Sequence, residues 1–261
     1  MCKLPDKVQP KNKGQLKQLI NYAFKHNIYD LNFIDTSEIT DMSKLFMSCE
    51  YNIDVSRWDV SNVTNMSQMF YFCVNFNCDL SGWDVSNVKN MCQIFYGCIR
   101  LNTDLSIWNV SNVTDMNHMF FCCENFDIKC FESWDVSNVT DMTGMFAFCK
   151  NFNCDLSNWD VSNVTDMSGL FVNCKNFNCD LSKCDVSNVK DAVNMFAGCY
   201  KFNGDLSNWD ISNLEDMSYM FNQCFAFRGK GLENWDVSKV KDMTNAFRMC
   251  KKSAIPSWYK K

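Results

Sequence analysis

Residues 159–182 read WDVSNVTDMSGLFVNCKNFNCDLS, and residues 134–157 read almost the same, WDVSNVTDMTGMFAFCKNFNCDLS. Related segments recur along the chain, and in nine of them a Phe stands three residues before a Cys. These pairs are Phe46/Cys49, Phe70/Cys73, Phe95/Cys98, Phe120/Cys123, Phe146/Cys149, Phe171/Cys174, Phe196/Cys199, Phe221/Cys224 and Phe247/Cys250. Successive Phe residues lie 24 to 26 positions apart. Such a period is typical of a solenoid, in which each unit buries its apolar face against its neighbours.

Two further positions of the repeat keep one residue type. Tryptophan recurs at Trp58, Trp83, Trp108, Trp134, Trp159, Trp209 and Trp235. Cys184 takes its place in one unit. Asparagine recurs at Asn62, Asn87, Asn112, Asn138, Asn163, Asn188 and Asn213. We expect the Phe, Cys and Trp columns to stack in the core, and the Asn side chains to hydrogen-bond the loop backbone of the next coil.

The local pattern predicts both a helix and strands in each unit. An Asp or Asn before each M-S-x-M-F segment, such as Asp166, is typical of a helix N-cap. Short parallel strands are expected near L-S-x-W and N-V-T, stacked at about 4.8 Å. We therefore predict about nine coils of ~25 residues over residues 31–250. Residues 1–30 would form an N-terminal cap with an amphipathic helix presenting Leu16, Leu19, Ile20 and Phe24, and residues 251–261 a C-terminal cap.

Composition favours a folded protein that binds neither nucleic acid nor the membrane interior. The chain has 261 residues, 47% of them hydrophobic, and a net charge of −5. Its only basic runs are the pairs Lys251-Lys252 and Lys260-Lys261, so the Lys/Arg footprint of a nucleic-acid-binding protein is missing. No stretch is apolar enough to span a bilayer, and the first residues lack the apolar region of a signal peptide. We expect a cytoplasmic protein with reduced cysteines, or a surface protein if a leader is missing or export is non-standard.

The sequence offers little to a catalytic or metal site. The only two histidines are His26, in the predicted cap helix, and His118, at a variable position before Met119 and Phe120. No C-x-x-C pair is present, and a column cysteine buried among apolar residues has nothing to activate it as a nucleophile. We therefore expect no enzymatic activity, no cofactor and no metal.

The consensus WDVSNVTDMSxMFxxCxxFNxDLS strongly resembles the repeat of the BspA-type leucine-rich-repeat surface proteins, which include the Mycoplasma-type repeat of unknown function. The resemblance covers about residues 31–250, and the opening LKQLI…DLNFIDTSEITDMSKLF resembles that family's N-terminal cap. It implies a leucine-rich-repeat-like α/β solenoid and a role in surface adhesion or protein binding.

One variable column is the candidate binding site. The residue after each repeat Phe is aromatic in three successive units and then becomes small or polar, with further aromatic residues beside it. The candidate partner-binding residues are Tyr71, Phe72, Tyr96, Phe121 and Phe148. An exposed aromatic row of this kind is typical of protein-binding surfaces, whereas the alternative is a column half-buried against the coil.

Two functions follow from these observations. The first is a non-enzymatic protein-binding repeat scaffold, adhesin-like or an adaptor, whose partner is another protein. The alternative is a structural or self-assembling element with no dedicated ligand, which predicts self-association.

Overall fold

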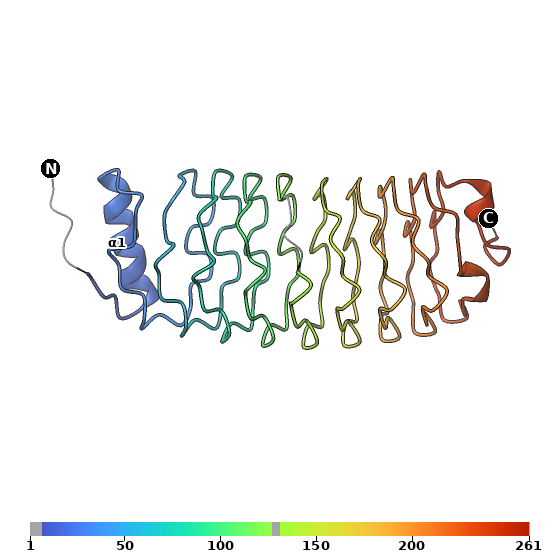
Figure 1. Ribbon diagram of the computed structural model, residues 1–261, viewed down its shortest axis with the longest axis horizontal. Helices are drawn as coiled ribbons and strands as arrows, with labels where there is room; N and C mark the ends of the chain where they lie inside the picture. Colours follow the sequence, from blue (N-terminus) through green and yellow to red (C-terminus); the bar gives the residue numbers. More distant parts are fainter. Residues whose placement is uncertain (1–6, 127–130, 261) are drawn as a thin grey trace.

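In the computed structural model, which describes residues 7–126 and 131–260, the chain winds into a row of similar coils (Figure 1). The ends of the predicted caps (residues 1–6 and Lys261) and the segment 127–130 lie outside the described residues. The helices are α1, Lys13–Lys25, and two 3-10 turns, η1, Leu232–Asn234, and η2, Lys252–Ala254. The coils stack side by side along one axis, with the two chain ends at opposite ends of the row.

The predicted leucine-rich-repeat-like α/β solenoid, with a helix and strands in every coil, is wrong. Among the described residues α1 is the only α-helix, and it lies in the N-terminal cap. Parallel pairing between coils is reduced to isolated bridges of one residue, such as Asp141 with Asp166 and Asp166 with Asp191. The coils are therefore built from turns, and the amphipathic helix is the only regular element of that prediction that forms.

Left-handed residues explain why no helix forms in the repeats. Each M-S-x-M-F-x-x-C segment holds two residues of positive φ four positions apart, as at Gly169 (61°) and Asn173 (59°). A left-handed residue cannot continue a right-handed helix, so the segment folds as two consecutive turns. In one coil they are closed by the N–H of Leu170 and of Cys174, each donating to the carbonyl three residues earlier (3.1 and 2.9 Å). The predicted N-cap Asp166 instead accepts from the N–H of Ser168 at 2.8 Å, within a turn.

Alternate residues of the same segment join each coil to the one that follows. Four N–H groups of one coil donate to carbonyls of the next at 2.6 to 3.0 Å. They run from Met66, Gln68, Phe70 and Phe72 to Asn90, Cys92, Ile94 and Tyr96, respectively. In this segment, the N–H groups that bond from coil to coil therefore point toward the C-terminal end of the row.

The repeated Phe residues form the core of the stack. Successive rings of this column lie 5.4 to 6.0 Å apart between centroids, from Phe46 to Phe247. None of these side chains is more than 3% exposed. This ring spacing is wider than the 4.8 Å expected from paired strands, in keeping with coils built from turns.

In three columns of the repeat, the side chains donate hydrogen bonds to backbone carbonyls of the preceding coil. The indole Nε1 of every tryptophan in the column does so at 2.9 to 3.3 Å. The thiols of the column from Cys73 onward donate at 2.9 to 3.2 Å. The amides of the Asn column donate at 2.7 to 2.8 Å, to the coil before rather than to the coil after. These side chains thus bond carbonyls that a turn-rich backbone leaves without a sheet partner.

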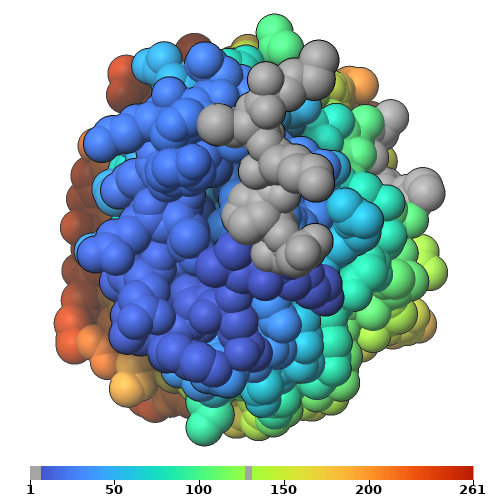
Figure 2. All heavy atoms as spheres, turned by 90° about the vertical axis from the view of Figure 1, so that its left-hand side faces the viewer, coloured from blue at the N-terminus to red at the C-terminus, as the bar shows by residue number. Residues whose placement is uncertain are grey.

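Helix α1 closes the N-terminal end of the row. Asn12 caps it by accepting from the N–H of Gln15 at 3.0 Å. The helix buries Leu16, Ile20 and Ala23. Figure 2 views this end and shows the blue atoms of the first segment lying across the stack. Within the described part of the chain, no helix combines the length and the apolar character that crossing a membrane requires.

Candidate functional site

The five candidate binding residues lie together in one aromatic stripe, defined here as Tyr71, Phe72, Tyr96, Phe121 and Phe148. The rings of Tyr71 and Tyr96 stack at 4.8 Å, and those of Tyr96 and Phe121 at 4.3 Å. Phe72 lies 5.3 Å from Tyr96, and Phe148 lies 5.1 Å from Phe121. The stripe therefore crosses four coils without a break.

The backbone of the coil fixes the place of each ring. Tyr71 follows the core residue Phe70, and its N–H closes a turn onto the carbonyl of Gln68 at 3.2 Å. Phe72 is one of the left-handed residues, with φ of 54°, and its N–H donates to the carbonyl of Tyr96 at 2.6 Å. Because each coil repeats this geometry, equivalent side chains are placed one above another.

The stripe is partly covered. The rings of Tyr71, Tyr96, Phe121 and Phe148 are half-buried, largely against one another, whereas Phe72 is 44% exposed. Burial also raises the pKa of Tyr96, with a smaller contribution from the nearby Tyr71 hydroxyl. The stripe thus presents one exposed ring at the edge of a row of fixed rings.

Glycine at position 97 makes room for that ring. Gly97 has φ of 73°, and a Cβ atom there would lie 2.9 Å from Cδ1 of Phe72. A side chain at this position would therefore displace the Phe72 ring. The contact joins two coils and cannot be identified from the spacing of the repeat.

His118, which the sequence places at a variable position, packs beside the stripe. Its ring lies 5.5 Å from that of Phe121 and 6.1 Å from that of Tyr96. Nδ1 lies 2.6 Å from Oδ1 of Asn117, and burial lowers the pKa of the imidazole. A Cβ atom at Gly144 would lie 2.8 Å from the His118 ring. A glycine one repeat after a bulky side chain, as at Gly97 and Gly144, is the sequence signal that could have revealed both contacts.

Acidic and amide groups border the stripe beside His118. Asn117 Nδ2 donates to Oδ2 of Asp141 at 3.3 Å. Burial raises the pKa of Asp115, and the neighbouring Asp141 carboxylate adds to the rise. No group of three or more potential metal ligands comes together in residues 7–126 and 131–260.

The column cysteines are protonated hydrogen-bond donors. All nine are thiols, buried from Cys73 to Cys224 and half-buried at Cys49 and Cys250. Burial raises the pKa of Cys73 to about 12 and that of Cys250 to about 11. A thiol held in its protonated form is a poor nucleophile and a poor metal ligand, so these groups serve the core.

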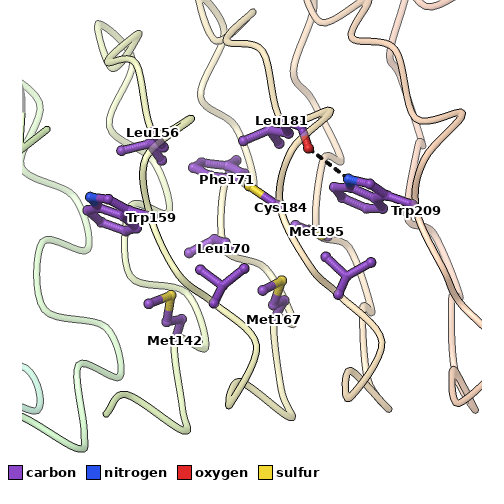
Figure 3. A pocket seen from close by; sticks show the side chains of 12 residues that line it. Met142, Leu156, Trp159, Met167, Leu170, Phe171, Leu181, Cys184, Met195 and Trp209 are labelled. Carbon is purple, nitrogen blue, oxygen red and sulfur yellow. Dashed lines mark hydrogen bonds between the residues drawn. The ribbon is translucent and has the colours of Figure 1, made fainter. Parts of the chain in front are cut away.

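A small apolar cavity marks the unit in which Cys184 replaces tryptophan. Figure 3 shows Cys184 between Trp159 and Trp209, where other coils hold an indole. The cavity measures about 20 Å³, and its lining is apolar. A second cavity of about 10 Å³ lies beside Ala192, which stands where most units have methionine. A space of this size has room for about one water molecule and offers no site for a larger ligand.

Comparison with known proteins identifies the repeat. A family model described as "Mycoplasma protein of unknown function, DUF285" matches residues 15–131, 98–193, 122–231 and 155–258. The overlapping matches confirm a tandem repeat of the Mycoplasma type along most of the chain. No curated protein and no solved structure matches the chain significantly.

Proposed function

The chain belongs to this Mycoplasma-type family of unknown function, and we propose that it is a non-enzymatic protein-binding repeat scaffold. The family description names no activity, so the side chains carry the proposal. The supporting observation is the exposed ring of Phe72 at the edge of the aromatic stripe. The partner is another protein, which covers this ring and the neighbouring edges of Tyr71 and Tyr96.

The physical argument concerns the cost of ordering the surface. Aromatic side chains bring a large contact area with few rotatable bonds, and they are enriched in the central residues of protein interfaces. The rings of the stripe are already held by stacking on one another and by a backbone bonded from coil to coil. A partner would therefore gain apolar contact while losing little side-chain entropy on this side of the interface.

The resemblance to BspA-type surface proteins supports a finer proposal, an adhesin-like role. The column of buried thiols favours instead an adaptor in a reducing compartment. Both roles use the same stripe.

Affinity purification from native extract tests the stripe. We expect one or more proteins to be retained by the wild-type chain and lost with Phe72→Ala. Phe225→Ala is the matched control, because Phe225 is 41% exposed and lies outside the stripe. Circular dichroism and the urea midpoint establish that both variants are folded. Equal retention of every protein by the two variants would overturn the proposal.

The alternative, a structural or self-assembling element, makes a different prediction. It requires oligomers whose population rises with protein concentration, measurable by light scattering. Oligomers that persist in Phe72→Ala, together with no partner retained by the wild-type chain, would favour this alternative.

A further inference from the structure

Charge is unevenly distributed along the row of coils. Residues 30–238 contain 28 Asp and Glu against 12 Lys and Arg. Residues 239–260, at the C-terminal end, contain six basic side chains and a single acidic one, Asp242. The basic side chains are Lys239, Lys241, Arg248, Lys251, Lys252 and Lys260. The C-terminal end of an acidic protein is thus strongly basic.

The same end also presents a row of backbone N–H groups. In the coil before it, four N–H groups donate to the last coil at 2.8 to 2.9 Å. These bonds run from Met217, Tyr219, Phe221 and Gln223 to Asp242, Thr244, Ala246 and Arg248, respectively. The equivalent N–H groups of the last coil belong to Met243, Asn245, Phe247 and Met249. Within the described part of the chain, none of these four has an acceptor.

The C-terminal cap packs against part of this coil, where the Tyr259 hydroxyl donates to the carbonyl of Met243 at 3.3 Å. Trp258 Nε1 donates to the carbonyl of Leu232 at 2.7 Å, and so continues the tryptophan column. The Trp258 and Tyr259 rings pack edge-on against Phe247, 6.1 and 5.0 Å away. Beside them an open hollow of about 550 Å³ is lined by Asn245, Phe247, Arg248, Met249, Lys252 and Tyr259, among others. Met249 is 58% exposed there.

We propose that this end binds an acidic peptide segment of another protein. Peptide carbonyls accept from the N–H groups of Met243, Asn245, Phe247 and Met249, as the carbonyls of the last coil accept from the coil before it. The acidic side chains meet Arg248 and Lys252. An apolar side chain enters the hollow beside Met249 and Tyr259. This site is separate from the aromatic stripe.

Charge argues against a second copy of the chain stacking end to end. Residues 7–29, at the N-terminal end, contain five lysines and no acidic residue. Two basic ends repel each other, and α1 already covers the N-terminal coil. An acidic peptide is attracted by the basic C-terminal end and has no covering helix of its own.

Fluorescence anisotropy with a labelled peptide, Glu-Leu-Glu-Phe-Glu-Leu-Glu, tests the charge requirement. We expect saturable binding that weakens with salt, and roughly tenfold or greater loss in the double variant Arg248→Glu/Lys252→Glu. The control Lys183→Glu/Lys201→Glu makes the same charge change at two exposed lysines on the body of the row and should bind as the wild type does. Equal loss in both double variants, or equal binding of a peptide with Lys in place of Glu, would overturn the proposal.

Amide hydrogen exchange tests the backbone pairing. Adding the acidic peptide should slow exchange at Asn245, Phe247 and Met249, and leave the equivalent, already bonded amides of residues 219–223 unchanged. Binding without this protection would overturn the proposal, as would full competition by an oligonucleotide of equal charge. If the wild-type chain forms oligomers that Arg248→Glu/Lys252→Glu abolishes, and the peptide does not bind, then the C-terminal end binds a second copy of this chain instead. Phe72→Ala should bind the peptide normally, so failure here is distinguishable from failure of the stripe.

Discussion

At the scale of the residue, the recurring cysteines and tryptophans have both a packing and a hydrogen-bonding role. Cys98 is buried, and its thiol donates to the carbonyl of Phe70 at 3.0 Å. Trp108 is buried, and its indole donates to the carbonyl of Leu80 at 3.0 Å. A residue of similar size without a donor would fill the same space and lose the bond, which explains why cysteine and tryptophan recur.

The buried thiols should make the protein labile to alkali. Burial raises the pKa of Cys73 to about 12 and that of Cys78 to about 11, from an ordinary value of 9.0. Above about pH 9 the unfolded chain loses thiol protons that the folded chain keeps, so the free energy of unfolding falls as pH rises. Urea unfolding should give equal midpoints at pH 7 and 8 and a lower midpoint at pH 10. Cys73→Ala should reduce this fall, and a midpoint that is unchanged at pH 10 would contradict the explanation.

Tryptophan at position 184 should overfill the unit in which Cys184 stands. The cavity beside Cys184 measures about 20 Å³, which is far less than an indole needs, so the neighbouring side chains already occupy most of that space. We expect Cys184→Trp to lower the free energy of unfolding by about 1–3 kcal/mol, measured with urea. In a coil that holds its indole, Trp108→Cys should lower it by about 3 kcal/mol. Stabilisation by Cys184→Trp would mean that the neighbouring coils part to admit the indole.

At the scale of the element, the M-S-x-M-F-x-x-C segment of each coil is a pair of turns and not a helix. Two left-handed residues in each M-S-x-M-F-x-x-C segment turn alternate N–H groups toward the next coil. This geometry also places the aromatic stripe, because Phe72 is itself left-handed and lies over Gly97. Backbone conformation and the candidate binding surface are therefore linked at position 97.

Substitution of Gly97 should affect both the stability of the coil and binding at the aromatic stripe. Gly97→Ala brings a Cβ atom within 2.9 Å of the Phe72 ring and strains a backbone with φ of 73°. We expect a loss of about 1–2 kcal/mol in urea unfolding, together with loss of the partner retained through Phe72. Gly82→Ala is the matched control, because a Cβ atom there would lie 3.8 Å from the Ser56 carbonyl oxygen, an ordinary contact, and the backbone there is not left-handed. Equal stability of the two variants would show that the contact with Phe72 is unimportant.

At the scale of the whole molecule, each coil depends on its two neighbours. The core runs through every coil as one column of rings, and α1 covers it at the N-terminal end. In such an array the effects of a local change stay near the changed coil. Within the described residues, α1 is therefore the element on which the order of the first coil most depends.

Weakening the N-terminal cap should loosen the first coil before the rest. Leu16 lies on α1 and is fully buried, and Leu16→Ala should cost about 2–5 kcal/mol locally. Hydrogen exchange should become faster at Met42 and Phe46, which are bonded to the second coil, and remain slow at Phe196 and Phe221. Uniformly faster exchange along the row would indicate that the coils unfold together.

The period of the repeat, the core columns and the five residues of the candidate stripe can be read from the amino-acid sequence. These follow from spacing, because like residues at a fixed period are brought into register by stacking. The backbone conformation of the coil and the N–H groups that lack acceptors within the described residues are visible only in the folded chain. The sequence pattern predicted helices and strands, but left-handed residues such as Gln68 and Asn173 replaced them with turns, and propensity does not reveal this. The contact of Phe72 with Gly97 and the four donors without acceptors depend on which backbone groups face a neighbouring coil, and no single repeat contains that information.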